Sequence, residues 1–105
     1  MKKPWFHILL SLASGDRYGS AIQEDVGRLS DGAVRLWPAT LYGALEELCE
    51  AGLIREVRPD EVPAEPAGRE RYYRITEPGR ALLRGEAQRL GALARVARAR
   101  LEGGA

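Results

Sequence analysis

The sequence predicts a mainly helical α+β fold with one small β-hairpin. Apolar residues recur every three or four positions before Gly52, alternate afterwards, and return to helical spacing beyond Thr76. A chain of 105 residues is long enough for one domain with a modest core. We therefore expect residues 1–76 to form one domain and residues 77–105 to form a terminal helix.

The charge of the chain is balanced in total but not in distribution. The formal net charge is +1, so composition alone does not indicate general affinity for nucleic acid. Acidic residues outnumber basic ones between Asp31 and Pro66, whereas arginines dominate between Arg69 and Arg100. The near-neutral total therefore conceals a basic C-terminal third.

The cysteine content and the N-terminal segment bear on location. A single cysteine excludes an internal disulfide framework, and no signal peptide is evident. The apolar run from Trp5 to Ala13 is too short to span a bilayer. We expect a cytoplasmic protein with no membrane partner.

The first two predicted helices have recognisable ends. Pro4 opens a helix that runs to about Ser14, and Gly15 can end it. A second helix covers about Tyr18–Leu29, and the turn at residues 30–32 closes it. Val34–Leu36 then forms a very short strand in this interpretation.

A third helix begins at Pro38 and ends before Gly52. Proline has no N–H to leave unbonded in a first turn, and glycine suits the left-handed position after a helix. Helical spacing places four apolar residues on the side that faces the core: Leu41, Ala44, Leu45 and Leu48.

The opposite side of this helix has two unlike halves. The side chains of its first turns are small, hydroxylated or uncharged. Gly43 among them permits either close approach of DNA or close packing against the second helix. Only this half can approach phosphates without repulsion, as a recognition helix does in a major groove. The uncharged half holds Pro38, Ala39, Thr40, Tyr42 and Gly43, and the acidic half holds Glu46, Glu47 and Glu50.

After Gly52 the sequence predicts a β-hairpin. Ile54–Arg58 and Arg69–Ile75 are its strands, and residues 59–68 join them with three prolines and three acids, as in a mobile solvated loop. Arg69 and Arg71 alternate, so they point to one side and can clamp a phosphate, while Arg74 faces the other way. The alternative reading of these arginines is a strand edge protected by charge.

The last predicted helix starts after Thr76, a good N-cap, and runs to about Glu102. Its apolar residues follow spacings of four and three, which indicates a short heptad seam for a second copy of the chain. The alternative is that the helix packs back on its own domain. The seam comprises Leu83, Ala87, Leu90, Ala94, Ala97 and Leu101.

Five motifs together resemble the PadR family of bacterial transcriptional regulators: Ile8–Leu12, Tyr18-Gly19, Pro38–Tyr42, Arg71–Thr76 and Gly79-Arg80. The resemblance implies a winged helix-turn-helix fold and a homodimeric repressor that binds double-stranded DNA. It also implies that the first and last helices build the dimer. A two-fold dimer with one recognition helix per subunit requires a pseudo-palindromic operator. We expect a small-molecule effector or another signal to release the protein from this operator.

The resemblance and the residue pattern together give a set of candidate DNA contacts. The chain departs from the family in three ways. The usual His-Gly-Tyr order is absent at residues 16–20, the wing tip is acidic, and a single helix replaces any large effector domain. The candidates are Pro38, Ala39, Thr40, Tyr42, Gly43, Arg35, Arg69, Arg71 and Tyr18. Local capping of its own helix is the alternative role for Thr40.

Other functional classes receive little support. No nucleophile elbow or phosphate loop is present, so we expect no enzyme and no cofactor. His7 is the only histidine, which disfavours a metal sensor, and Glu46 and Glu50 should raise the pKa of the Cys49 thiol, which disfavours a redox sensor.

Two questions stay open at this level. Trp5, Phe6 and Trp37 could stack on a flat ligand, but large aromatic residues at such positions more often pack in a core or a dimer. The rival to a DNA-binding regulator is a winged-helix module that binds another protein, which the acidic middle of the chain would suit.

Overall fold

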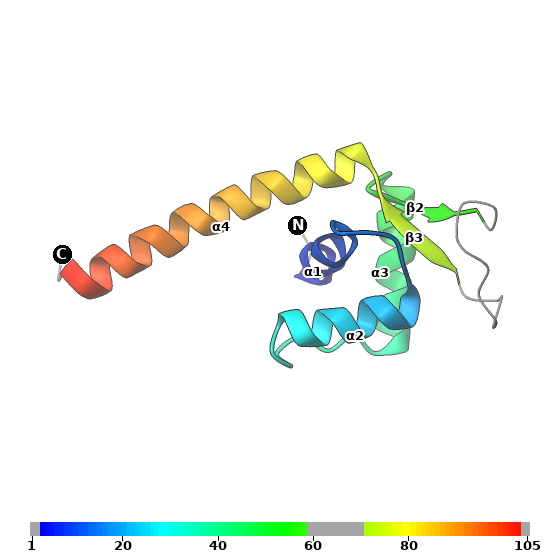
Figure 1. Cartoon of the computed structure of the whole chain (residues 1–105), viewed down its shortest axis with the longest axis horizontal. Coiled ribbons are helices and arrows are strands. Elements are labelled where there is room, and N and C mark those ends of the chain that lie inside the picture. Colours follow the sequence, from blue (N-terminus) through cyan, green and yellow to red (C-terminus); the bar gives the residue numbers. More distant parts are fainter. Residues whose placement is uncertain (1–2, 59–70, 104–105) are drawn as a thin grey trace.

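The computed structural model describes residues 3–58 and 71–103. Three short helices pack against one another, a small sheet lies beside the third, and a long terminal helix extends away from them (Figure 1). The predicted fold class is confirmed. The elements are α1 (Lys3–Leu12), β1 (Arg17–Tyr18), α2 (Gly19–Leu29), α3 (Pro38–Glu50), β2 (Ile54–Val57), β3 (Tyr72–Ile75) and α4 (Glu77–Gly103).

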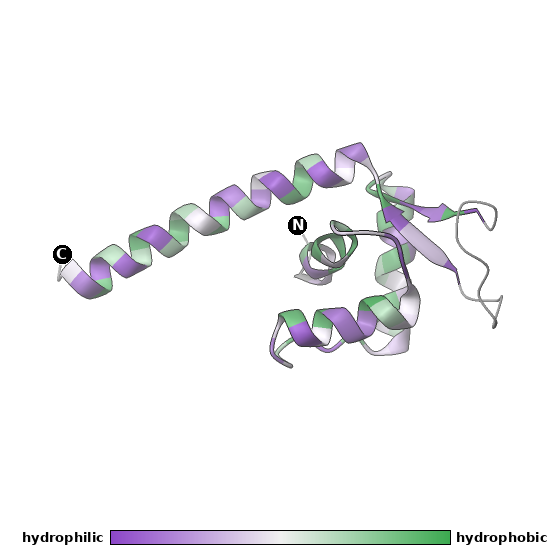
Figure 2. Cartoon of the chain, viewed as in Figure 1, coloured by the Kyte–Doolittle hydropathy of each residue, from purple (hydrophilic) through white to green (hydrophobic). Residues whose placement is uncertain are grey.

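The core lies where α1, α2 and α3 meet the inner face of the sheet. Apolar side chains at helical spacing line the inward side of each helix, which Figure 2 shows as green patches between them. The predicted stripe of α3 is confirmed, because all four of its residues are buried. The fully buried side chains include Ile8, Leu9, Leu12, Ile22, Val26, Leu41, Leu45, Leu48 and Ile54.

The sheet has three antiparallel strands in the order β1-β3-β2. The predicted hairpin is confirmed by β2 and β3, in which Ile54 pairs with Ile75. The third strand is not the predicted one: Arg17–Tyr18 pairs with β3, in the register Arg17 to Tyr73 and Tyr18 to Tyr72.

The segment Val34–Leu36 is not a strand, which corrects the sequence-based expectation. Side chains of α2 and the following turn satisfy its backbone instead. The Gln23 amide donates to the carbonyl oxygen of Leu36, and the Val34 N–H donates to the Ser30 hydroxyl at 3.0 Å. Leu36 is buried in the core, so this segment serves to lead the chain into α3.

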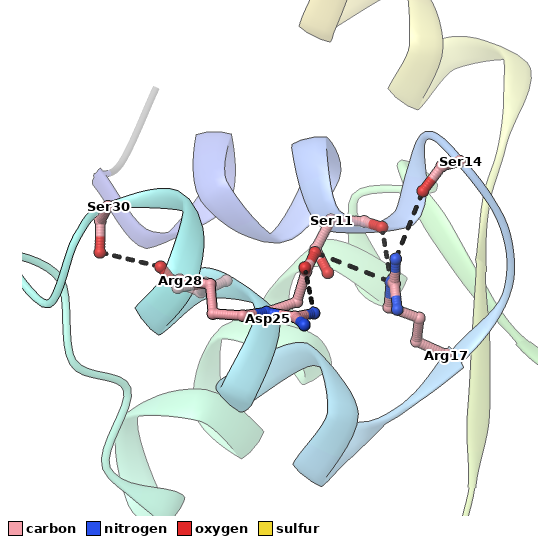
Figure 3. A network of polar contacts seen from close by, with 7 residues as sticks. Ser11, Ser14, Arg17, Asp25, Arg28 and Ser30 are labelled. Carbon is pink, nitrogen blue, oxygen red and sulfur yellow. Dashed lines mark hydrogen bonds and ion pairs between the residues drawn. The ribbon is translucent and has the colours of Figure 1, made fainter.

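A polar network joins α1, β1 and α2 around Asp25 (Figure 3). Arg28 donates to the Asp25 carboxylate at 2.9 Å. Arg17 Nε lies 3.7 Å from the same carboxylate and donates to the carbonyl oxygen of Ser11 at 2.9 Å. Burial by itself would raise the pKa of Asp25, but the Ser11 hydroxyl and the two guanidinium groups outweigh it and hold this pKa below its ordinary value.

A second ion pair fixes β3 to the loop before β1. Arg74 donates to both carboxylate oxygens of Asp16, with Nε 3.0 Å from Oδ1 and a terminal nitrogen 2.8 Å from Oδ2. Tyr73 and Ile75 on either side of Arg74 face the core. Arg74 therefore faces the other way, as predicted, and its partner gives it a structural role.

The first turns of α4 are attached to the domain. The Gly79 N–H donates to the Thr76 hydroxyl at 3.2 Å, so the predicted N-cap is confirmed. That hydroxyl also donates to the carbonyl oxygen of Gly52 at 2.7 Å, and Arg80 donates to the carbonyl oxygen of Ala13 at 3.3 Å. The Leu53 carbonyl occupies the space that a Cβ on Gly79 would need, so the close crossing requires glycine.

Beyond these turns the helix leaves the domain. Leu83 packs against the core of its own chain, whereas Leu90 is 39% exposed and Leu101 is 84% exposed. Three apolar residues of the same helix that lie outside the predicted seam are also exposed: Leu82, Leu93 and Val96. Within residues 3–58 and 71–103, no helix is both long enough and apolar enough to cross a membrane.

Candidate nucleic-acid interface

The N-terminal half of α3 presents the predicted uncharged face to solvent. Pro38, Ala39, Thr40, Tyr42 and Gly43 are all exposed, and the buried stripe lies on the other side of the helix. The acids Glu46, Glu47 and Glu50 are exposed in the second half. Figure 2 shows the same change along the helix, from pale colours in its first turns to purple in the later ones.

The first turn of α3 has no side-chain cap. Trp37 occupies the N-cap position and makes no capping hydrogen bond, and the first helical bond runs from the Leu41 N–H to the Trp37 carbonyl at 2.8 Å. The amides of Ala39 and Thr40 therefore lack acceptors within the helix. Thr40 lies two positions inside the helix from Pro38, and the N-cap position belongs to Trp37.

Tyr42 lies over the start of α2. Its side chain is 53% exposed, and a Cβ added to Gly19 would stand 3.0 Å from its hydroxyl oxygen and 3.2 Å from Cε1. A Cβ on Gly43, in contrast, would meet nothing within 4 Å. The close contact between α2 and α3 is therefore made at Gly19, whereas Gly43 borders open space.

Tyr18 stands beside this contact, at the junction of β1 and α2. Its half-buried ring meets Tyr72 edge to face, with the ring centroids 5.4 Å apart. Arg35 is exposed in the loop that leads to α3. The structure thus brings the Tyr18–Gly19 junction next to Tyr42, close to the uncharged face.

The predicted phosphate clamp in the wing is only partly described. Arg71 is exposed, and its Nε lies 3.7 Å from a carboxylate oxygen of Glu56 on β2. Both side chains are more than half exposed, so this pair is weak and can exchange for another anion. Arg69 and the joining segment 59–68 lie outside the described residues.

Cys49 lies half-buried at the edge of the core. Its pKa is raised, as predicted, but the cause differs from the prediction. Burial is the main cause, and the negative charge of Glu56 on the neighbouring strand adds to it. The sequence pointed to Glu46 and Glu50, because it shows neighbours along the helix but not across the sheet.

Sequence reasoning missed two residues of this surface. Trp37 is 65% exposed, so it does not pack in the core of its own chain, whereas Trp5 does pack against it. Its position directly before Pro38, at the surface where a helix starts, was the available signal. Gly19 carried no such signal, because its close neighbour Tyr42 is distant in the sequence.

Three helices, a hairpin after the third and an exposed recognition face define a winged helix-turn-helix protein. The model of the PadR-like family of transcriptional regulators matches residues 8–85, and the chain belongs to this family. Among the described residues, no group of three potential metal ligands gathers.

Solved structures share the fold. A PadR family transcription regulator from Clostridium difficile has a TM-score of 0.75 at 24% identity, over 95% of this chain and 99% of that one. Bacillus subtilis PadR in complex with operator DNA has a TM-score of 0.69 at 18% identity, over 83% of this chain and 46% of that one.

One relative found by sequence is a much larger protein. The chain is 37% identical over 86 residues to an uncharacterized 37.1 kDa protein in transposon TN4556 of Streptomyces fradiae. The match covers 82% of this chain but only 22% of that protein. The chain thus spans about a fifth of the length of this relative.

Proposed function

We propose that this chain is a cytoplasmic, homodimeric repressor that binds duplex DNA through the N-terminal half of α3. The observation that carries the proposal is the exposed, uncharged start of α3, with free amides at Ala39 and Thr40 and hydroxyls at Thr40 and Tyr42. Helix N-termini attract phosphates, and hydroxyls can donate to base edges or backbone oxygens.

The dimer in this proposal is built by residues 77–105, with residues 1–76 as the DNA-binding domain. The exposed apolar residues of α4 support it, because an exposed apolar patch of this kind marks a surface for association. Two α3 helices related by a two-fold axis require a pseudo-palindromic site with half-sites about one helical turn apart, or a multiple of it. The related fold of B. subtilis PadR, solved in complex with operator DNA, supports DNA as the partner.

The phosphate contacts must be few. The acids of α3 repel phosphates, so we assign the contacts to the helix start, Arg35 and the wing arginines Arg69 and Arg71. With about 6 phosphate contacts per dimer, log affinity should fall against log salt with a slope of about −5. A small-molecule effector or another signal would then release the DNA by changing the angle between the subunits.

The experiment is a binding titration with the duplex from directly upstream of the gene, against a random duplex of equal length, at several salt concentrations. We expect tighter binding to the upstream duplex with the stated slope. Thr40→Val keeps the shape of the side chain and removes the hydroxyl, so it should reduce discrimination between the two duplexes. Equal affinity for both duplexes, together with tight capture of a protein partner, would favour the interaction-module alternative.

A further inference from the structure

Trp37 is the most exposed aromatic side chain among the described residues, at 65%. The backbone that carries it is nevertheless fixed on both sides. Leu36 is buried, and its carbonyl accepts a hydrogen bond from Gln23. The carbonyl of Trp37 accepts the first helical bond, from the Leu41 N–H. The indole is therefore presented at a defined place rather than on a loose loop.

This residue is an unfavourable choice for its position on structural grounds alone. Serine, threonine, aspartate and asparagine are favoured at an N-cap because they bond to the first amides, which Trp37 does not do. A large apolar surface in water is unfavourable as well. A residue that breaks local rules without an internal gain is expected at a functional site.

The local sequence around Trp37 suits contact with a polyanion. Residues 32–45 contain no acid and one base, Arg35, which is exposed two positions earlier. Pro38 and Ala39, on the other side of the indole in sequence, are exposed and uncharged. The indole itself offers one N–H donor, no acceptor, and a flat apolar face.

We propose that Trp37 is a contact to the DNA backbone at each half-site. Its indole N–H donates to a phosphate oxygen, and its ring face packs on the neighbouring deoxyribose. This inference rests on the proposed function, because it extends the surface of α3 that would meet DNA. Since the contact involves the backbone, it positions the helix without reading sequence.

Fluorescence of single-tryptophan proteins tests the contact directly. Trp5→Phe leaves only Trp37, and Trp37→Phe leaves only Trp5, which packs against the core. Acrylamide is an uncharged quencher, so DNA does not repel it. We expect saturating duplex to lower the quenching constant of Trp37 by about threefold and to leave that of Trp5 unchanged.

Affinity measurements supply a second readout. Trp37→Ala should weaken binding to the upstream and the random duplex alike by about tenfold, and Trp37→Phe by less, because it keeps a ring. The salt slope should not change, since an uncharged indole displaces no counterion. Leu29→Ala is the matched control, since Leu29 is 50% exposed and is the last residue of α2, whereas Tyr42 contacts the first, Gly19. It should bind as the parent protein does.

Several results would overturn the inference. Duplex binding that leaves the quenching of Trp37 unchanged, or a Trp37→Ala protein of parental affinity, would refute the contact while the proposed function stands. A loss of discrimination between duplexes without a general loss of affinity would indicate a base contact instead. Protection of Trp37 that grows with protein concentration in the absence of DNA would assign it to a dimer interface. Failure of the parent protein to bind any duplex would overturn both proposals.

Discussion

Helices α3 and α4 carry apolar residues at the same helical spacing, but the chain covers only one of the two stripes. In α3, Leu41 is 1% exposed and Leu48 is not exposed at all. In α4, Leu93 is 54% exposed and Leu101 is 84% exposed. The same pattern therefore closes the domain in one helix and leaves an uncovered surface in the other.

The difference begins at a defined point in α4. Gly79 and Arg80 are in contact with the domain, and Leu83 is the last residue of the predicted seam that packs against its core. Helical periodicity predicts that a face is apolar, but it does not say which surface covers that face. Variants that change one stripe or one surface at a time can separate residues that close the domain from residues that are available to a partner.

The largest effect should come from a charge in the uncovered stripe of α4. In the proposed dimer, Leu90→Glu would remove the burial of a leucine in each of two copies, about 3 kcal/mol in all, and should weaken dimerisation by about a hundredfold or more. Sedimentation equilibrium at micromolar concentration should report a monomer, and circular dichroism should show that the domain still melts cooperatively.

Gln88→Glu is the matched control, because Gln88 is exposed on the opposite side of the same helix. It adds the same charge and should remain a dimer. If Leu90→Glu also remains a dimer, the seam is misassigned and the comparison between the two helices fails.

A smaller effect is expected inside the domain, at Asp25. The folded-state pKa of Asp25 lies below its ordinary value, so the charged carboxylate stabilises the fold above that ordinary value. This contribution is lost as pH falls through the lowered pKa. Asp25→Asn should cost about 2 kcal/mol at pH 7 and flatten the loss of stability in acid. Melting temperatures measured between pH 7 and pH 3 test this.

Glu24→Gln provides the comparison, since Glu24 is the exposed neighbour of Asp25 on α2. It should melt at the parental temperature throughout. Equal pH dependence in the Asp25→Asn and parent proteins would show that the network around Asp25 does not support the domain.

The next prediction concerns the contact between α2 and α3. Gly19→Ala places a Cβ 3.0 Å from the Tyr42 hydroxyl oxygen, and the outer end of that side chain can move away. The melting temperature should change little, whereas affinity for the upstream duplex should fall by about tenfold, because one hydrogen-bonding group is displaced in each subunit. Gly43→Ala is a useful contrast, because its Cβ would meet nothing in the free protein. If Gly19→Ala binds like the parent, the position of Tyr42 is not set by this contact.

Local sequence patterns were sufficient to predict the helices and the hairpin. Pro38 and Gly52 mark the ends of α3, where Gly52 has a φ of +75°, and Thr76 marks the start of α4. These signals work because caps and turn glycines act on their own immediate backbone.

The remaining features depend on pairs of residues that are distant in the sequence. The two-residue strand β1 forms only because β3 lies beside it, and the Asp16–Arg74 pair has the same origin. The Gly19–Tyr42 contact and the effect of Glu56 on Cys49 are likewise contacts between elements. The hydrogen bond from Gln23 to the Leu36 carbonyl, which holds the loop before Trp37, also joins residues that are distant in the sequence.

The smallest expected effect lies in the wing, where Arg71 is compared with the face of α3. Arg71 is exposed and only loosely paired with Glu56, so it can exchange this partner for a phosphate. Arg71→Ala should weaken binding to the upstream and random duplexes alike and make the salt slope shallower by about two per dimer. Arg84→Ala, which removes an exposed arginine from α4, should leave the slope unchanged. Glu56→Gln should slightly strengthen binding to both duplexes, because it releases Arg71 from its carboxylate partner. An unaltered slope in Arg71→Ala would remove this residue from the phosphate contacts and leave the α3 surface to supply them.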